Sequence, residues 1–237
     1  ACASCHDAQV QDWTDSHHDL AMQEANEKTV LGDFDNATFI YEGVTTTFSR
    51  KGDEYWVKTD NENGELQDYR VAYVFGVYPL QQLLLPIQND RLNALSIAWD
   101  SRNTSEGGQR WYHIYENQEP VTSESPLHWT GIYHNWNSRC AECHSTNVVK
   151  GYDGERRQYT TTYDQIDVGC EACHGPGSRH IELATAGKVD RSQSPAEMGL
   201  ALSLAARGQW SRAPEDDIAR RVTALTDQTQ VDNCGRC

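Results

Sequence analysis

The 237-residue chain carries 35 acidic and 20 basic residues, which gives a formal charge of −15 at pH 7. Nucleic acid is excluded as a partner by this charge, and no apolar run approaches the roughly 20 residues that span a bilayer. Only 38% of the residues are hydrophobic, and the length predicts one or two domains.

Residues 1–30 form the first predicted segment. It opens with Cys2, Cys5 and His6, a CxxCH motif of the kind that attaches haem covalently. The two thiols are spaced to form thioethers with the haem vinyl groups, and the adjoining imidazole binds the iron. Residues 11–27 are rich in helix formers, and we expect a short helix there.

Residues 31–119 form an inserted domain of antiparallel β-strands. β-branched and aromatic residues alternate there, and turn dipeptides begin at Lys51 and Asn63. Pro79 and Pro86 bracket an apolar stretch that we expect as a loop or short helix. An insert of this length either covers the haems or meets a neighbouring protein. The predicted strands are 38–48, 55–58, 69–75, 92–99 and 111–115.

Residues 120–237 form the predicted multihaem core. They hold two complete CxxCH motifs, at 140–144 and 170–174, and the pair Cys234 and Cys237, which lacks the following histidine. The fold class is therefore α+β, with a haem-packed core of short helices and loops beside the inserted antiparallel sheet. The elements expected beyond the motifs are helices at 181–186 and 192–206 and a hairpin at 210–222.

All eight cysteines fall into four CxxC pairs, three of them followed at once by histidine. Disulfides would not require that histidine, and a zinc ribbon places its two CxxC pairs about 15–20 residues apart, closer than these. We therefore expect four haem c groups. The predicted haem-binding residues are Cys2, Cys5, His6, Cys140, Cys143, His144, Cys170, Cys173, His174, Cys234 and Cys237.

The histidine count bears on the function. Nine histidines less the three within the motifs leave six, enough to give four irons a second axial ligand. An iron with two imidazoles has no open position for a substrate, so the count favours electron transfer over catalysis. His180 has the strongest case, because two glycines and a proline turn the chain back from His174. The other candidates, each with a packing role as its alternative, are His17, His18, His113, His128 and His134.

The chain resembles the multihaem cytochrome c proteins whose haem domain precedes tetratricopeptide repeats. Its CHGPGxxH element is also similar to the wider group of nitrifier tetrahaem cytochromes and relatives of hydroxylamine oxidoreductase. The runs that carry this resemblance are SHHDLAM at 16–22, HWTG at 128–131, NWN at 135–137 before CAECHST, and GCEACHGPGSRH at 169–180.

The resemblance implies a fourth haem on Cys234 and Cys237, with more protein beyond. It also implies a set of distal iron ligands, chosen in preference to His17 and His134. That implied set is His18, His113, His128 and His180.

Two main functions follow from these patterns. The first is an electron-transfer cytochrome, periplasmic or extracellular with its leader removed, whose partners are other redox proteins or copies of itself. In a polymeric haem wire, a surplus histidine such as His134 would ligate a haem of the next subunit. The alternative is an oxidoreductase acting on a small nitrogen or sulfur compound at one open haem, although the lysine-ligated CxxCK motif is absent. A weaker third possibility is a docking module in which the β-insert binds a redox partner.

Overall fold

The computed structural model describes residues 2–190, 192–202, 204, 209–215, 217–223 and 228–235. The chain divides into two compact units. We call Ala1–Gln11 with Gly169–Cys237 the terminal unit, and Asp12–Val168 the central unit. Short helices and antiparallel sheets make the fold α+β, as predicted. The division of the sequence at residues 30 and 119 stays a prediction.

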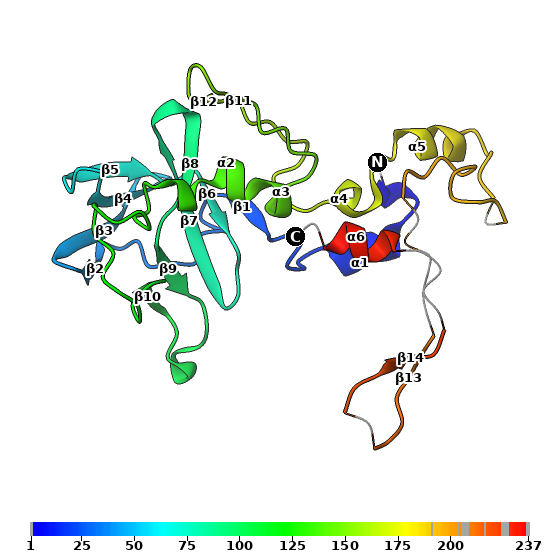
Figure 1. The fold of residues 1–237 in the computed structure, drawn as a ribbon, viewed down its shortest axis with the longest axis horizontal. Helices are drawn as coiled ribbons and strands as arrows, with labels where there is room; N and C mark the ends of the chain where they lie inside the picture. The colour runs from blue at the N-terminus through cyan, green and yellow to red at the C-terminus, as the bar shows by residue number, and fades with distance from the viewer. Residues whose placement is uncertain are drawn as a thin grey trace. The chain divides into compact units, whose positions relative to one another are not determined.

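The central unit contains a four-stranded antiparallel sheet in the order β2-β3-β4-β5 (Figure 1). Consecutive strands are neighbours, so the sheet is a simple meander. Its register pairs Phe48 with Val57 and Val57 with Tyr69, three side chains that are all buried. The strands are β2 (Ala37–Tyr41), β3 (Val44–Lys51), β4 (Glu54–Asp60) and β5 (Leu66–Arg70).

A second antiparallel sheet of six strands has the order β1-β6-β7-β9-β10, with β8 also paired to β7. Aromatic and aliphatic side chains from both sheets form one core, in which Phe48 stacks on Trp111 at 3.7 Å between ring centroids. The strands are β1 (Met22–Glu24), β6 (Tyr73–Phe75), β7 (Leu80–Ile87), β8 (Arg91–Ala94), β9 (Ile97–Asp100) and β10 (Arg110–His113).

Strand β7 corrects the prediction of a loop or short helix between Pro79 and Pro86. Leu83, Leu84 and Leu85 are each at most 1% exposed. Leu83 and Leu85 pack into the core shared by the two sheets, and Leu84 packs on the other face with Met22, Trp136 and Ala141. A short apolar run buried on both faces lacks the alternation of a half-buried strand. The sequence pattern therefore did not distinguish it from a buried helix.

The predicted strand 38–48 is instead the hairpin of β2 and β3. Glu42 and Gly43 form its turn with φ of +46° and +79°. Two consecutive positive φ values are the pattern of a two-residue hairpin turn, which favours glycine. The turns at Lys51-Gly52 and Asn63-Gly64 lie where they were predicted, between β3 and β4 and between β4 and β5.

The predicted helix 11–27 is mostly wrong. Helix α1 (Asp7–Trp13) ends early, and the chain turns before entering β1. Asp15 adopts a φ of +61°, and its backbone N–H donates to the Asp19 carboxylate at 2.8 Å. Side chains of this kind offer the backbone a partner outside the helix, and the helix stops there.

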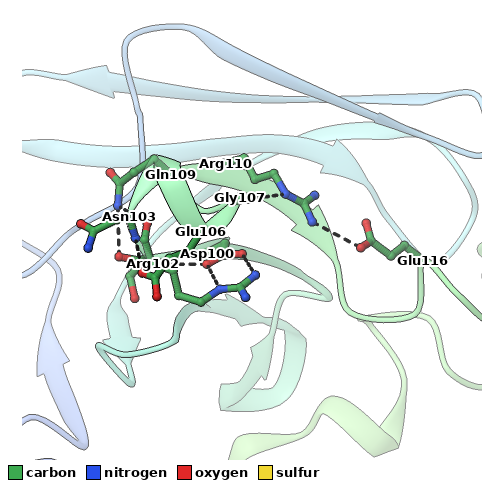
Figure 2. Close-up of polar contacts among 9 residues, drawn as sticks. Asp100, Arg102, Asn103, Glu106, Gly107, Gln109, Arg110 and Glu116 are labelled. Carbon is green, nitrogen blue, oxygen red and sulfur yellow. Dashed lines mark hydrogen bonds and ion pairs between the residues drawn. The ribbon is translucent and has the colours of Figure 1, made fainter.

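The loop between β9 and β10 is polar, as predicted, and hydrogen bonds within it hold its conformation (Figure 2). Asp100 is 3% exposed and accepts from the Arg102 guanidinium through both oxygens, at 3.0 and 2.6 Å. The Gln109 side-chain amide donates to the carbonyls of Ser101 and Arg102. The short 3-10 helix η3 (Thr104–Glu106) forms the tip of the loop.

Two short helices follow β10 in the central unit, α2 (Trp136–Arg139) and α3 (Ala141–His144), and the 3-10 helix η4 (Ile132–His134) precedes them. Figure 1 shows α2 and α3 beside β1 and β6. Trp136 and Ala141 are each 1% exposed and pack with Met22 and Leu84. This second core fixes the two helices to the six-stranded sheet. A small hairpin of β11 (Tyr152–Asp153) and β12 (Gln158–Tyr159) comes next.

The terminal unit holds short helices and one small hairpin. Helix α5 and the hairpin β13–β14 agree with the helix predicted at 181–186 and the hairpin at 210–222. The helix predicted at 192–206 is not found in the described part of that range, which consists of turns and bends. The elements are η1 (Cys2–Ser4), α4 (Cys170–His174), α5 (Ser178–Thr185), β13 (Trp210–Ser211), β14 (Arg220–Arg221) and α6 (Thr229–Cys234).

Within the described ranges, no helix combines the length and apolar character needed to cross a lipid bilayer.

Candidate haem sites

The CxxCH motif of the central unit lies at the junction of α2 and α3. The backbone N–H groups of Cys143 and His144 both bond to the carbonyl of Cys140, at 3.1 Å each. This turn holds the two cysteines and the histidine close together. Both cysteines are partly exposed, whereas the neighbouring Ala141 is buried in the core. The helix is therefore anchored through Ala141, and Cys140 packs partly against the same core.

The imidazole of His144 is held by two contacts within the central unit. Its ring meets Phe75 edge-on at 5.4 Å, and its Nδ1 lies 3.4 Å from the carbonyl oxygen of Ala21. A metal-binding histidine commonly donates one ring N–H to a carbonyl, which leaves the other nitrogen for the metal. The contact with Ala21 therefore leaves Nε2 of His144 as the atom available to iron.

In the terminal unit, three of the CxxC pairs come together. Cys2 lies near enough to Cys170 to raise the pKa of its thiol, and the Asn233 side-chain amide donates to the carbonyl of Cys173 at 3.0 Å. Asn233 precedes Cys234, so the fourth pair is tied to the third. Cys237 lies outside the described residues, and its predicted role in a fourth haem site stays a prediction.

Burial shifts the pKa of a cysteine thiol in the same direction in the two units. Burial raises the pKa of the Cys140 thiol, and the adjacent Cys143 raises it further. Burial also raises the pKa of the Cys170 thiol, with Cys2 as its neighbour. Both groups are thus thiols rather than thiolates at neutral pH.

His180 faces the first motif's histidine within the terminal unit. The ring centroids of His6 and His180 lie 6.2 Å apart with a tilt of 32°, and Nδ1 of His180 bonds to the carbonyl of Met198 at 2.8 Å. Nε2 of His180 is therefore the free ring nitrogen. Gly175 ends α4 with φ +70°, which makes the predicted reversal after His174 possible.

The candidate ligands His17 and His18 both lie in the turn after α1 and are exposed. The backbone N–H of His18 lies 3.3 Å from the Ser16 hydroxyl, and its carbonyl accepts from the backbone N–H groups of Val168 at 3.1 Å and Ala21 at 3.3 Å. Both imidazoles are accessible from solvent.

The remaining candidates, His113, His128 and His134, are buried at 3–5% exposure in the central unit. His128 bonds through Nε2 to Asp60 at 3.1 Å and through Nδ1 to Thr130 at 2.8 Å. His113 and His128 line a cavity of about 230 Å³ whose lining residues include no cysteine. The structure therefore brings these two together with Asp60 and with no CxxCH motif in the cavity wall.

Burial also controls the charge of His113 and His134. It lowers the pKa of His113 to about 4, with the nearby His134 as a second cause. Burial lowers the pKa of His134 as well, although its bond to the carbonyl of Leu127 acts in the opposite direction. Both imidazoles are neutral at pH 7. The sequence did not single out Asp60, which lies 68 positions from His128.

The donor set fits covalent haem better than the alternatives. No disulfide joins any two of the seven described cysteines. Across the described ranges, no three His, Cys, Asp or Glu side chains are gathered so as to hold a metal ion. Unpaired cysteines are usually buried, but five of these are half-exposed and two exposed, each beside an imidazole or another CxxC pair. Partly exposed thiols of this kind are accessible to haem vinyl groups.

A family model agrees with this chemistry. The model for cytochrome c554 and c-prime matches residues 1–39 and 99–175, just under half of the chain. The matched segments contain all three complete CxxCH motifs. The chain is a multihaem c-type cytochrome. The family match implies haem c as its cofactor.

The stretch of this cytochrome between the matched segments, residues 40–98, contains β3 to β7, β8 and the start of β9. The cytochrome is also similar to a solved structure, the crystal structure of the outer cell wall cytochrome OcwA, with a TM-score of 0.46 and 20% identity. That similarity covers 84% of this chain and 35% of the other, so the chain spans about a third of the length of OcwA. No curated protein matches the sequence.

Proposed function

We propose that this cytochrome passes electrons through haems whose irons each carry two histidine ligands. The proposal extends to four haems, the fourth on Cys234 and Cys237. The proximal ligands within this chain are His6, His144 and His174. With two imidazoles on each iron, electrons enter and leave through the haem edges and no substrate binds the metal.

The observation that carries the proposal is the pairing of His6 with His180. Two metal–imidazole bonds of about 2 Å each, with the ring radii added, set two axial rings roughly 6 Å apart between centres. The centroids of His6 and His180 are 6.2 Å apart. Direct ring stacking is much closer, as between Tyr41 and His113 at 3.7 Å. The spacing therefore favours His180 as the distal ligand to the iron of the first motif.

Accessibility supports His18 as a second distal ligand. Its ring is exposed, whereas its backbone is fixed by bonds to Ser16 and Val168. Ligation by His113 or His128 stays a prediction. It would require His128 to give up its bond to Asp60, and His113 to leave its stacking on Tyr41.

We further propose that the cytochrome works outside the cytoplasm, in the periplasm or at the cell exterior, with other redox proteins or copies of itself as partners. Covalent haem attachment through CxxCH takes place there in bacteria. If the chain forms a polymeric haem wire, His17 is better placed than His134 to ligate a haem of the next subunit. His17 is exposed, while His134 is 5% exposed and bonded to Leu127.

The test is low-temperature electron paramagnetic resonance of the oxidised holoprotein, with a haem count by mass spectrometry. We expect four haems and low-spin ferric signals throughout. His180→Ala should convert one haem to high spin, and added imidazole should restore the low-spin signal. His134→Ala is the matched control, since it removes a buried imidazole that the proposal does not place on iron in this chain.

Two results would contradict the proposal. A high-spin component in the unmodified protein that shifts on adding nitrite, hydroxylamine or cyanide would reveal an open iron and favour an oxidoreductase. An unchanged spectrum in the His180 variant would remove the pairing with His6.

A further inference from the structure

The central unit contains a cavity of about 230 Å³ apart from the CxxCH motifs. Its walls come from both sheets, through β2, β3, β4, β9 and β10, and from the loop at 121–129. At about 30 Å³ for each water, this volume corresponds to roughly seven or eight waters. The cavity is therefore of a size for a small organic molecule rather than for an ion alone.

One wall presents a buried hydrogen-bond acceptor, the Asp60 carboxylate. Asp60 is 8% exposed, and its oxygens bond to Nε2 of His128 at 3.1 Å and to the Thr59 hydroxyl at 3.3 Å. A carboxylate has about four acceptor positions, so two remain. The Nδ1 atom of His128 bonds to the Thr130 hydroxyl at 2.8 Å, which fixes the imidazole ring. The fixed ring in turn orients the Asp60 carboxylate through Nε2.

The cavity also presents a hydrogen-bond donor, the imidazole of His113. Its Nδ1 accepts the backbone N–H of Tyr115 at 3.3 Å, so the ring proton resides on Nε2. No bond from this N–H to any described residue is found, although His113 is 3% exposed and lines the cavity. Tyr41 stacks on the ring at 3.7 Å and 8°, which holds it in place.

We propose that this cavity binds a small neutral hydroxylated molecule of monosaccharide size. A hydroxyl group both donates and accepts, so it matches Asp60 and His113 together. An anion would meet the carboxylates of Asp60 and Glu42, and a cation would meet the N–H of His113. The apolar side chains of Leu95, Ile97 and Trp129 in the same wall suit the C–H faces of a sugar ring.

The test is isothermal titration calorimetry of the holoprotein with glucose, galactose and N-acetylglucosamine, and with tetramethylammonium and phosphate for comparison. We expect saturable binding of at least one neutral sugar and of neither ion. Asp60→Asn should weaken that binding at least tenfold. Asp68→Asn is the matched control, because Asp68 is an exposed carboxylate on the neighbouring strand β5.

Thr122→Trp tests the site without removing a buried contact. Thr122 is exposed and lines the cavity, so a large ring there should block the entrance and abolish binding without changing the thermal midpoint. Absence of binding by all three sugars, binding of an ion instead, or full binding by the Thr122 variant would overturn the proposal.

Electron paramagnetic resonance of a His113 variant distinguishes the cavity proposal from the prediction that His113 binds iron. His113→Gln should weaken sugar binding without producing a high-spin signal, and the fourth iron then takes its distal ligand from outside this chain. A new high-spin signal in that variant would assign His113 to iron and overturn the cavity proposal. Because the calorimetric readout does not depend on spin state, the bis-histidine proposal and the cavity proposal fail separately.

Discussion

The indole N–H of Trp136 donates a hydrogen bond to the sulfur of Met22 at 2.9 Å, and both side chains are 1% exposed. The Ser145 hydroxyl approaches the same sulfur at 3.7 Å. Met22 comes from β1 and Trp136 from α2, so this contact joins the sheet to the helices that carry Cys140 and Cys143. The buried sulfur, with these two contacts, makes Met22 a core residue.

Met22→Leu should therefore destabilise the protein without altering its haems. Leucine conserves the volume but leaves the Trp136 N–H buried without an acceptor, which costs about 1–3 kcal/mol of unfolding free energy. Urea denaturation of the holoprotein measures this loss, and optical spectra report the iron ligands. A changed axial-ligand spectrum would contradict the core role of Met22.

The adjacent His17 and His18 provide a matched pair of variants. Both imidazoles are exposed, and glutamine preserves the backbone bonds that His18 makes. We expect His18→Gln to convert one low-spin haem to high spin and His17→Gln to leave the spectrum of the single chain unchanged. Electron paramagnetic resonance at equal haem concentration measures both. The reverse result would exchange the roles of the two histidines.

The CxxCH motifs were predictable because their chemistry is local. Two cysteines and a histidine within five positions specify haem attachment whatever surrounds them, and the turn at Cys140 needs only its own backbone bonds. Strand β4 was likewise evident from alternation, since Tyr55 and Val57 are buried on one face. The reversal between His174 and His180 followed from its glycines and proline.

What the sequence did not reveal depends on contacts between distant residues. Leu84 is buried against Met22 of β1 and Trp136 of α2, while Leu83 and Leu85 are buried in the core shared by the two sheets. A local pattern does not specify these contacts. Asp60 and His128 meet across 68 positions, and Tyr41 meets His113 across the two sheets. Local spacing therefore predicted the CxxCH sites, whereas the surroundings of the buried histidines required the tertiary structure.

The ion pair between Asp100 and Arg102 should make the β9–β10 loop sensitive to acid (Figure 2). The hydrogen bonds from Arg102 hold the pKa of Asp100 below its usual value. A depressed folded-state pKa stabilises the fold above the unfolded pKa of about 4, and that stability is lost as the pH falls through the folded value. Asp100→Asn should cost about 1–3 kcal/mol at neutral pH and progressively less below about pH 4.

Urea unfolding of the holoprotein across this pH range measures the effect. The control is Asp68→Asn, which breaks the ion pair with Lys51, whose two side chains are each 53% exposed. An exposed pair of this kind contributes at most about 1 kcal/mol. If the Asp100 and Asp68 variants behave alike at neutral pH, the ion pair of Asp100 with Arg102 has no special role in stability.

Tyr69 should make the central unit sensitive to alkali. Burial, followed by the charges of Glu62 and Asp60, raises its pKa to about 12. A raised folded-state pKa means that the stability is complete below the unfolded pKa of about 10 and is lost as the pH rises toward the folded value. Between about pH 10 and pH 12 the natural protein should therefore lose roughly 2–3 kcal/mol more than Tyr69→Phe does.

The comparison isolates Tyr69 because every other titrating group is shared by the two proteins. Phenylalanine keeps the edge-on contact with Trp129, whose ring centroid lies 4.9 Å from that of Tyr69, so the two proteins should have similar stability at neutral pH. Tyr78→Phe, at a tyrosine that is 54% exposed, serves as the control and should follow the natural protein at all pH values. Parallel stability curves for the natural protein and Tyr69→Phe above pH 10 would show that the Tyr69 hydroxyl is not desolvated in the fold.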